Sequence, residues 1–219
     1  HRVLLVGDLI LDRYVYGDAE RISPEAPVPV LRVVERTEAV GGSGNVAACL
    51  QALGVETVVC GLVGDDAPGR RLKQLLTEFG ADVSGVLAVD DRPTTTKTRL
   101  VGLAQHRHRQ QLMRVDEESV APLGATDRKR LRGLVLDAVA QVDAVCIEDY
   151  EKGLITAELV AELVGAARQH GIPVLVDPGR ISDYSRYRGA TLLTPNRNEL
   201  TLATGRERNA IDDIAAEAD

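Results

Sequence analysis

RVLLVGDLILDRYVYGDAERISPEAPVPV (residues 2–30) begins as an apolar strand and then turns polar for a long stretch. Residues 3–6 are all apolar, which predicts a strand buried on both faces of a sheet. The segment behind it carries Asp8, Asp12 and three prolines, and its pattern predicts neither a helix nor a simple turn. A carboxylate beside a buried strand is costly unless a backbone cap, an arginine or a hydroxyl-rich ligand satisfies it.

The composition is that of an ordinary globular domain. The chain has 219 residues, of which 44% are hydrophobic and 27% charged, and its net charge of −7 argues against a general nucleic-acid binder. No apolar run approaches the roughly 20 residues of a membrane-spanning helix, and we recognise no signal peptide, so we expect a cytoplasmic protein. Cys49, Cys60 and Cys146 are widely spaced, which favours reduced thiols over a metal site.

Strand-like and helical segments alternate along most of the chain. Strands are predicted over 2–8, 56–64, 85–91, 143–150, 173–179 and 190–196, and helices over 44–54, 69–80, 126–142 and 156–171. This alternation is typical of an α/β fold with a mainly parallel sheet. Residues 27–40 and 94–115 hold strands without an intervening helix, so they cannot join that sheet through helical crossovers. They predict a small separate β-sheet, which we interpret as a lid.

Polar side chains gather where four of the predicted strands end. These side chains are Asp8 and Asp12, Glu148 and Asp149, Asp177, and Asn196 with Glu199. A single acidic strand end is more often a turn or a helix cap. The carboxyl ends of parallel strands, however, meet at one edge of the sheet, where ligands bind. Four such ends therefore predict a site at that edge, although Asp8 stays open between site and turn.

Two glycine-containing segments need separate interpretation. VGGSGNVA (40–47) precedes a predicted helix and is either a flexible turn or a place where backbone amides approach a ligand. It lacks the G-x-G-x-x-G spacing of a dinucleotide site. GDDAPGR (64–70) lacks the Lys-Ser/Thr ending of a phosphate-binding P-loop, so we interpret it as an ordinary turn.

Taken together, these segments resemble the ribokinase (PfkB-type) family of carbohydrate kinases. The resemblance is carried, in family order and over most of the chain, by GDLILDRYVYGDAERISPEAPVPV, GGSGNVAACLQALG, TTTKTRLV, QQLMRVDEE, EDYEKG and RYRGATLLTPNRNEL. The RISPEAPVPV run points to the branch that phosphorylates D-glycero-β-D-manno-heptose 7-phosphate at its anomeric oxygen, in ADP-heptose and lipopolysaccharide core precursor synthesis. The resemblance implies a three-layer αβα fold with lid strands at about 12–40 and 94–115, and it implies ATP and Mg²⁺ as cofactors.

The resemblance also implies which residues hold the sugar. Asp12 matches a family aspartate that binds sugar hydroxyls, and Gly41, Gly42 and Asn45 match the family's GG-x-x-N motif. Asp149 matches another acid that faces the site, with capping of the next turn as an equally open alternative. Such a set suits a sugar, because a carboxylate accepts hydroxyl donors while an amide both donates and accepts.

A sugar phosphate also needs cationic partners. Lys97 and Arg99 lie two residues apart on a predicted strand and so share a face. They are the main candidates for the phosphate, with Lys152 as a further one, and a solvated lid face is the alternative. HRHR (106–109) is interpreted as a solvated hairpin tip, with contact to the substrate phosphate as the second choice.

The N-x-x-E pair, Asn196 and Glu199, matches the family signature near the nucleotide phosphates and Mg²⁺. Glu199 would act on the metal through water, since Mg²⁺ keeps several waters; a helix cap is the alternative for the pair. Relatives commonly have Asp-Pro-Lys where this chain has Asp177–Gly179, and we expect Arg180 to be able to supply the missing cation.

The family's Gly-Ala-Gly-Asp motif, which supplies an anion hole and the catalytic base, does not occur in the sequence. We therefore expect residues 1–219 to be the N-terminal portion of a kinase domain, with the base beyond Asp219, and to have little activity alone. Another PfkB-type sugar kinase and a non-catalytic sugar-phosphate-binding protein are the alternatives. Because lid strands would leave open edges, we also expect a homodimer through the lid, with no nucleic-acid or membrane partner.

Overall fold

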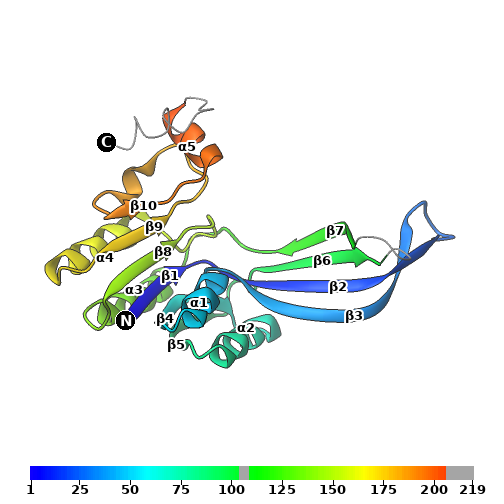
Figure 1. The fold of residues 1–219 in the computed structure, drawn as a ribbon, viewed down its shortest axis with the longest axis horizontal. Coiled ribbons are helices and arrows are strands. Elements are labelled where there is room, and N and C mark those ends of the chain that lie inside the picture. Colours follow the sequence, from blue (N-terminus) through cyan, green and yellow to red (C-terminus); the bar gives the residue numbers. More distant parts are fainter. Residues whose placement is uncertain (104–108, 206–219) are drawn as a thin grey trace.

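A computed structural model describes residues 1–103 and 109–205 of the protein. Its body is a six-stranded parallel sheet in the order β10-β9-β8-β1-β4-β5 (Figure 1). These strands are β1 Arg2–Gly7, β4 Glu56–Gly64, β5 Asp82–Val89, β8 Ala144–Glu148, β9 Val174–Asp177 and β10 Leu192–Leu193. The prediction of an α/β fold with a mainly parallel sheet is thus confirmed.

Helices cover both faces of this sheet. They are α1 Ser43–Ala52, α2 Ala67–Glu78, α3 Ala125–Val139, α4 Ala157–Gln169 and α5 Arg197–Thr204, with a short 3₁₀ helix, η1, at Tyr184–Tyr187. Leu4 packs in a cluster with residues of α3 and α4, while its neighbour Leu5 packs with residues of α1 and α2. Successive residues of a strand point to opposite faces, so the apolar run of β1 supplies both cores of a three-layer αβα body. Among the described residues, no helix is long and apolar enough to cross a membrane.

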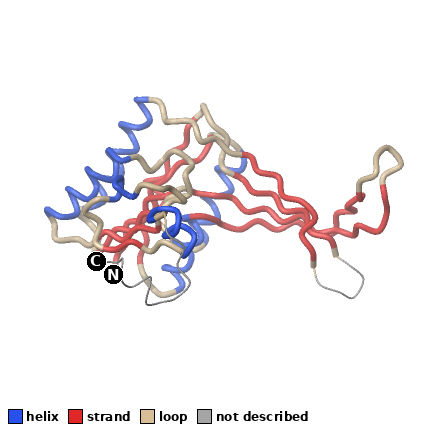
Figure 2. The backbone as a smooth tube through the Cα atoms, turned by 90° about the horizontal axis from the view of Figure 1, so that it is seen from above, coloured by secondary structure: helices blue, strands red, loops and turns tan. Residues whose placement is uncertain are grey.

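The lid is a second, four-stranded sheet in the order β3-β2-β6-β7, which projects from the body (Figure 2). Its strands are β2 Leu9–Ile22, β3 Pro29–Gly42, β6 Thr96–Gly102 and β7 Gln110–Glu117. β2 pairs antiparallel with β3 and parallel with β6, and β6 pairs antiparallel with β7. The small separate sheet is confirmed.

The polar segment behind Asp8, whose own pattern predicts no regular element, is the single 14-residue strand β2, within the range of about 12–40 where the resemblance implies lid strands. Its partner β3 pairs with it along its length, with register shifts after Tyr16 and Asp18. Most residues of β2 from Asp12 onwards are only partly buried or exposed, so no apolar alternation marks the strand. Pairing within the lid therefore forms β2 where the sequence pattern gives no signal.

Asp66 joins the base of the lid to the body. It caps α2 by accepting from the Gly69 amide at 2.7 Å, and it also accepts from the amide and the hydroxyl of Thr94 at 2.9 and 2.6 Å. The Thr94 hydroxyl in turn accepts from the Gly64 amide at 2.8 Å. GDDAPGR, interpreted from the sequence as an ordinary turn, is therefore the start of α2 and holds the segment that leads into β6.

Replacing Asp66 with alanine should lower the free energy of unfolding by about 1–3 kcal/mol, because the helix loses its cap and the buried Thr94 loses its partner. Urea denaturation of the two proteins measures the difference. Asp65→Ala is the matched control, since the exposed side chain of Asp65 makes a surface ion pair with Arg70. Equal losses for both variants would contradict the role assigned to Asp66.

Candidate functional site

The acidic strand ends lie side by side, as the sequence predicts. In the sheet register Gly7, Glu148 and Asp177 are at one level of the neighbouring strands β1, β8 and β9. Burial raises the pKa of Glu148 to about 7, and the carboxylate of Asp177 adds to the shift. Burial also raises the pKa of Asp177, with a further contribution from Glu199. The edge therefore concentrates acidic groups, whose ionised forms a cation would stabilise.

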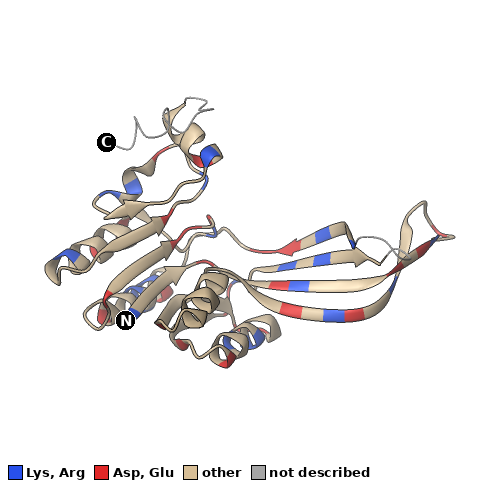
Figure 3. Cartoon of the chain, in the orientation of Figure 1, with Lys and Arg blue, Asp and Glu red and all other residues tan. Residues whose placement is uncertain are grey.

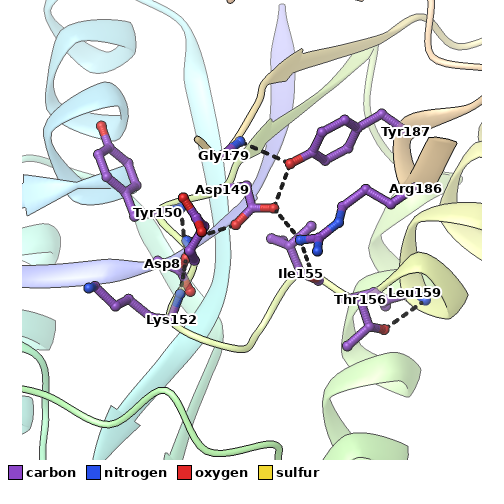
Figure 4. A network of polar contacts seen from close by, with 11 residues as sticks. Asp8, Asp149, Tyr150, Lys152, Ile155, Thr156, Leu159, Gly179, Arg186 and Tyr187 are labelled. Carbon is purple, nitrogen blue, oxygen red and sulfur yellow. Dashed lines mark hydrogen bonds and ion pairs between the residues drawn. The ribbon is translucent and has the colours of Figure 1, made fainter. Parts of the chain in front are cut away.

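Asp8 ties the end of β1 to the loop behind β8. Its Oδ2 accepts from the backbone amides of Tyr150 at 2.8 Å and Lys152 at 3.1 Å (Figure 4). The residue is only 4% exposed, and burial raises its pKa to about 6 despite these two hydrogen bonds. The structure thus gives Asp8 a turn-holding role, which the sequence leaves open.

The carboxylate of Asp149 is engaged within the protein. Its Oδ1 accepts from the Glu151 amide at 2.8 Å, and its Oδ2 accepts from the Tyr187 hydroxyl at 2.6 Å and from Arg186 Nη1 at 3.0 Å (Figure 4). The Tyr187 hydroxyl also accepts from the Gly179 amide at 2.9 Å. These contacts favour capping over direct contact between Asp149 and a sugar.

The cation beside this network is Arg186, which the sequence analysis missed. Arg180, expected to replace the missing lysine, is exposed. A Cβ atom at Gly179 would lie 2.9 Å from Cγ of Glu151 and 3.3 Å from Cγ of Asp149, so this turn packs closely. Arg186 is the first residue of RYRGATLL, part of a segment that carries the family resemblance. Its place in that segment was the sequence signal that could have identified it.

At the base of the lid, three predicted sugar-site residues meet. Arg99 Nη1 donates to Asp12 Oδ1 at 2.7 Å, and both side chains are about one-fifth exposed. A Cβ atom at Gly41 would lie 2.6 Å from Oδ2 of Asp12, so a larger residue there would displace this carboxylate. Lys97 lies opposite Asp12 in the register of β2 and β6. Residues from β2, β3 and β6 therefore converge, although they are far apart in sequence.

The start of α1 adjoins this cluster. Gly42, the residue before the helix, has φ of 56°, and a Cβ atom there would lie 2.5 Å from the Asp8 carbonyl oxygen. The Ser43 amide donates to that carbonyl at 3.0 Å, while the Ser43 hydroxyl is buried without a hydrogen-bond partner in the structure. Asn45 is exposed in the first turn. Helix α1 thus begins beside Asp8, and any other residue in place of Gly42 would strain the backbone.

The other basic residues that the sequence suggests for the phosphate already have partners within the protein, where the structure describes them. Lys152 Nζ pairs with Glu118 Oε2 at 2.9 Å, which holds the lysine against the residue that follows β7. Of HRHR, residues 106–108 lie outside the described residues, and Arg109 lies over the ring of Tyr16, 4.9 Å from its centroid.

Asn196 and Glu199 form a capping box at the start of α5. The Asn196 side chain accepts from the amides of Asn198 and Glu199, and the Glu199 carboxylate accepts from Asn196 N and Nδ2 at 2.8 and 2.5 Å. The helix-cap alternative is therefore present. In the parts of the chain that the structure describes, no three His, Cys, Asp or Glu residues are arranged to bind a metal directly. Because Mg²⁺ keeps several waters, the acidic edge is compatible with the water-mediated contact expected for Glu199.

The pKa of Glu148 predicts a pH-dependent stability. The folded state holds this proton between the ordinary pKa of 4.5 and about 7, so the free energy of unfolding should fall as pH rises through that window, by up to about 1.4 kcal/mol per pH unit. Glu148→Gln should make this fall smaller, leaving the part that the raised pKa values of Asp8 and Asp177 contribute, and should stabilise the protein relative to the wild type most above pH 7.

Urea denaturation at pH 5, 6, 7 and 8 measures the free energy of unfolding of both proteins. Asp91→Asn, in an exposed loop, is the control. A Glu148→Gln profile parallel to that of the wild type would refute the assignment.

Comparison with known proteins gives consistent relatives. The pfkB family carbohydrate kinase profile matches residues 1–219. "Bifunctional protein HldE" of Mesorhizobium japonicum is 45% identical over 217 residues, which are 99% of this chain and 42% of the relative. The protein of the same name from Geobacter metallireducens is 45% identical over 202 residues, 92% of this chain and 40% of the relative. The chain thus spans about two-fifths of the curated relatives it matches.

Solved structures show the same fold. Arabidopsis thaliana ribokinase complexed with ribose and ATP has a TM-score of 0.69 at 20% identity, over 98% of this chain and 66% of that one. The tetrameric inhibited form of phosphofructokinase-2 from Escherichia coli has a TM-score of 0.71 at 21% identity, over 98% and 67%. Fold and family profile agree, and the chain belongs to the pfkB family of carbohydrate kinases.

Proposed function

We propose that the protein containing this chain transfers the γ-phosphoryl group of ATP to the anomeric oxygen of D-glycero-β-D-manno-heptose 7-phosphate. Family membership and the 43–45% identity with bifunctional HldE proteins support this proposal. The observation that carries it is the contact of Asp12 with Arg99 beside Gly41. This contact sets an acceptor for sugar hydroxyls directly against a donor for phosphate oxygens.

Within this proposal, one carboxylate has two tasks. Oδ1 of Asp12 holds Arg99, which leaves Oδ2 to accept from a sugar hydroxyl. Gly41, Gly42 and Asn45 supply backbone and amide contacts to the other hydroxyls. Lys97 makes no ion pair within residues 1–103 and 109–205, so its ammonium group is available to the phosphate.

The ATP-binding half of the site is assigned to the sheet edge where the parallel strands end, at the start of α5 and away from the lid base. Asn196 and Glu199 would lie near the ATP phosphates, and Glu199 would hold the water shell of Mg²⁺. The metal supplies charge neutralisation for the transferring phosphoryl group. Lys152, placed by Glu118, is a further contact for a phosphate, and Asp149 acts on the site by shaping the loop that contains Lys152.

Two alternatives differ in a measurable way. Another sugar kinase of the family would prefer a different sugar in a substrate panel. A non-catalytic sugar-phosphate-binding protein would bind heptose 7-phosphate without turning over ATP. The identity with HldE proteins over 92–99% of the chain favours the heptose kinase.

Asp12→Asn should raise the KM for heptose 7-phosphate by about tenfold to a hundredfold in the full-length protein, because it weakens the charged hydrogen bonds to both the hydroxyl and Arg99. A coupled ADP-release assay measures this change. Asp18→Asn is the matched control in the same strand, since Asp18 pairs with Arg32 on the lid surface. An Asp12 variant with wild-type kinetics would exclude the proposed sugar site.

We further propose that two copies associate through the lid. Apolar side chains are exposed on both edge strands of this sheet: Val33 and Val34 on β3, and Leu112, Met113 and Val115 on β7. Exposed strand edges with apolar side chains favour pairing.

Val34→Glu should halve the solution mass of the full-length protein in light scattering, because a charge in the interface opposes association. Val120→Glu, at an equally exposed position in a loop outside the lid, should leave the mass unchanged. A monomeric wild-type protein would rule out the lid dimer.

A further inference from the structure

Charged residues are spread along the lid strands β2, β6 and β7 (Figure 3). The strand register sets six side chains in two adjacent rows: Tyr14, Arg99 and Arg114 in one, and Asp12, Lys97 and Asp116 in the other. Residues directly opposite each other on neighbouring strands project from the same face. All six side chains therefore share the face of Asp12, on which the sugar site is proposed.

Arg99 and Arg114 are directly opposed across β6 and β7. Two like charges in this arrangement destabilise a sheet. Each guanidinium is held by an acid of the other row: Arg99 by Asp12 at 2.7 Å, and Arg114 by both oxygens of Asp116 at 2.8 Å. These acids do not neutralise the face, because Lys97 adds a third cation that makes no ion pair in the described parts of the chain.

The hydrogen bonds leave donors free on both guanidiniums. Arg114 uses Nε and Nη2 for Asp116, and Arg99 uses Nη1 for Asp12. Arg99 also lies over the Tyr14 ring, 5.1 Å from its centroid, which restricts its orientation. Guanidinium groups match phosphate oxygens with planar pairs of N–H donors. A phosphate shared by the two arginines would bond to both and remove the cost of their opposition.

We propose that Arg114 binds the phosphate that the sugar substrate already carries, together with Arg99 and Lys97, and that Asp116 positions Arg114. This inference rests on the proposed function and restricts its substrates to sugar phosphomonoesters. Arg114 is 47% exposed and Arg99 is 21% exposed, so Arg114 forms the outer side of the phosphate site, where a ligand entering from solvent reaches it.

Calorimetric titration of the full-length protein tests the assignment, with heptose 7-phosphate and the same heptose lacking phosphate as ligands. Arg114→Gln should raise the Kd for the phosphorylated sugar by about tenfold to a hundredfold and leave that for the neutral sugar unchanged. Arg114→Lys should recover part of the loss because it keeps the charge. Asp116→Asn should raise the Kd for the phosphorylated sugar alone, by less than Arg114→Gln does.

Arg36→Gln is the matched control. Arg36 lies opposite Val15 in the register of β2 and β3 and therefore on the other lid face, so this variant should bind both sugars like the wild type. Thermal unfolding of each variant monitors its fold. An unchanged Kd for the sugar phosphate in Arg114→Gln, or an equal loss for both sugars, overturns the role of Arg114.

The outcomes separate this role from the proposed function. If the wild type phosphorylates heptose 7-phosphate and Arg114→Gln does so with the same KM, the assignment of Arg114 fails alone. If the wild type prefers another sugar phosphate and the Arg114→Gln variant loses affinity for that sugar phosphate, the assignment of Arg114 holds and the heptose specificity fails. A wild-type protein that binds no phosphorylated sugar refutes both.

Discussion

The ion pair of Asp12 with Arg99 is the interaction on which the arrangement of the lid base depends. It joins β2 to β6 through their side chains, and glycine at position 41 leaves the carboxylate in place, because a Cβ atom there would displace it. Such a pair, about one-fifth exposed, contributes through geometry more than through free energy. It holds the carboxylate and the guanidinium at a fixed separation, which is the preorganisation that the proposed binding of a sugar phosphate needs.

The acidic residues where the parallel strands end have two different roles. Asp8 and Asp149 are buried carboxylates that fold the loop behind β8, through amides of that loop and through Tyr187. Glu148, by contrast, keeps a raised pKa next to Asp177. Some acids at this edge thus shape loops, whereas Glu148 and Asp177 lie with raised pKa values at the carboxyl ends of the strands, where open parallel sheets bind ligands.

Several features of the fold followed from sequence because they depend on local patterns. The apolar run of β1 and the alternation of strands and helices predicted the body correctly. Strand β2 was expected only through the family resemblance, because its pairing partner, not its own pattern, stabilises it. GDDAPGR was misjudged because the role of Asp66 depends on Thr94, 28 residues away. Likewise, Asp149 could not be assigned without Tyr187 and Arg186, which follow it by more than 35 residues.

Sequence alone determined the fold class, the family and the set of polar residues at the strand ends, because these are encoded in short motifs and in the periodicity of apolar residues. Only the tertiary structure decided which of those residues touch: Asp12 with Arg99, Asp8 with the loop after β8, Lys152 with Glu118. It also opposed Arg99 with Arg114 across the lid. The physical reason is that charge pairing and burial depend on distances between segments, which strand register and packing set and which no local pattern contains.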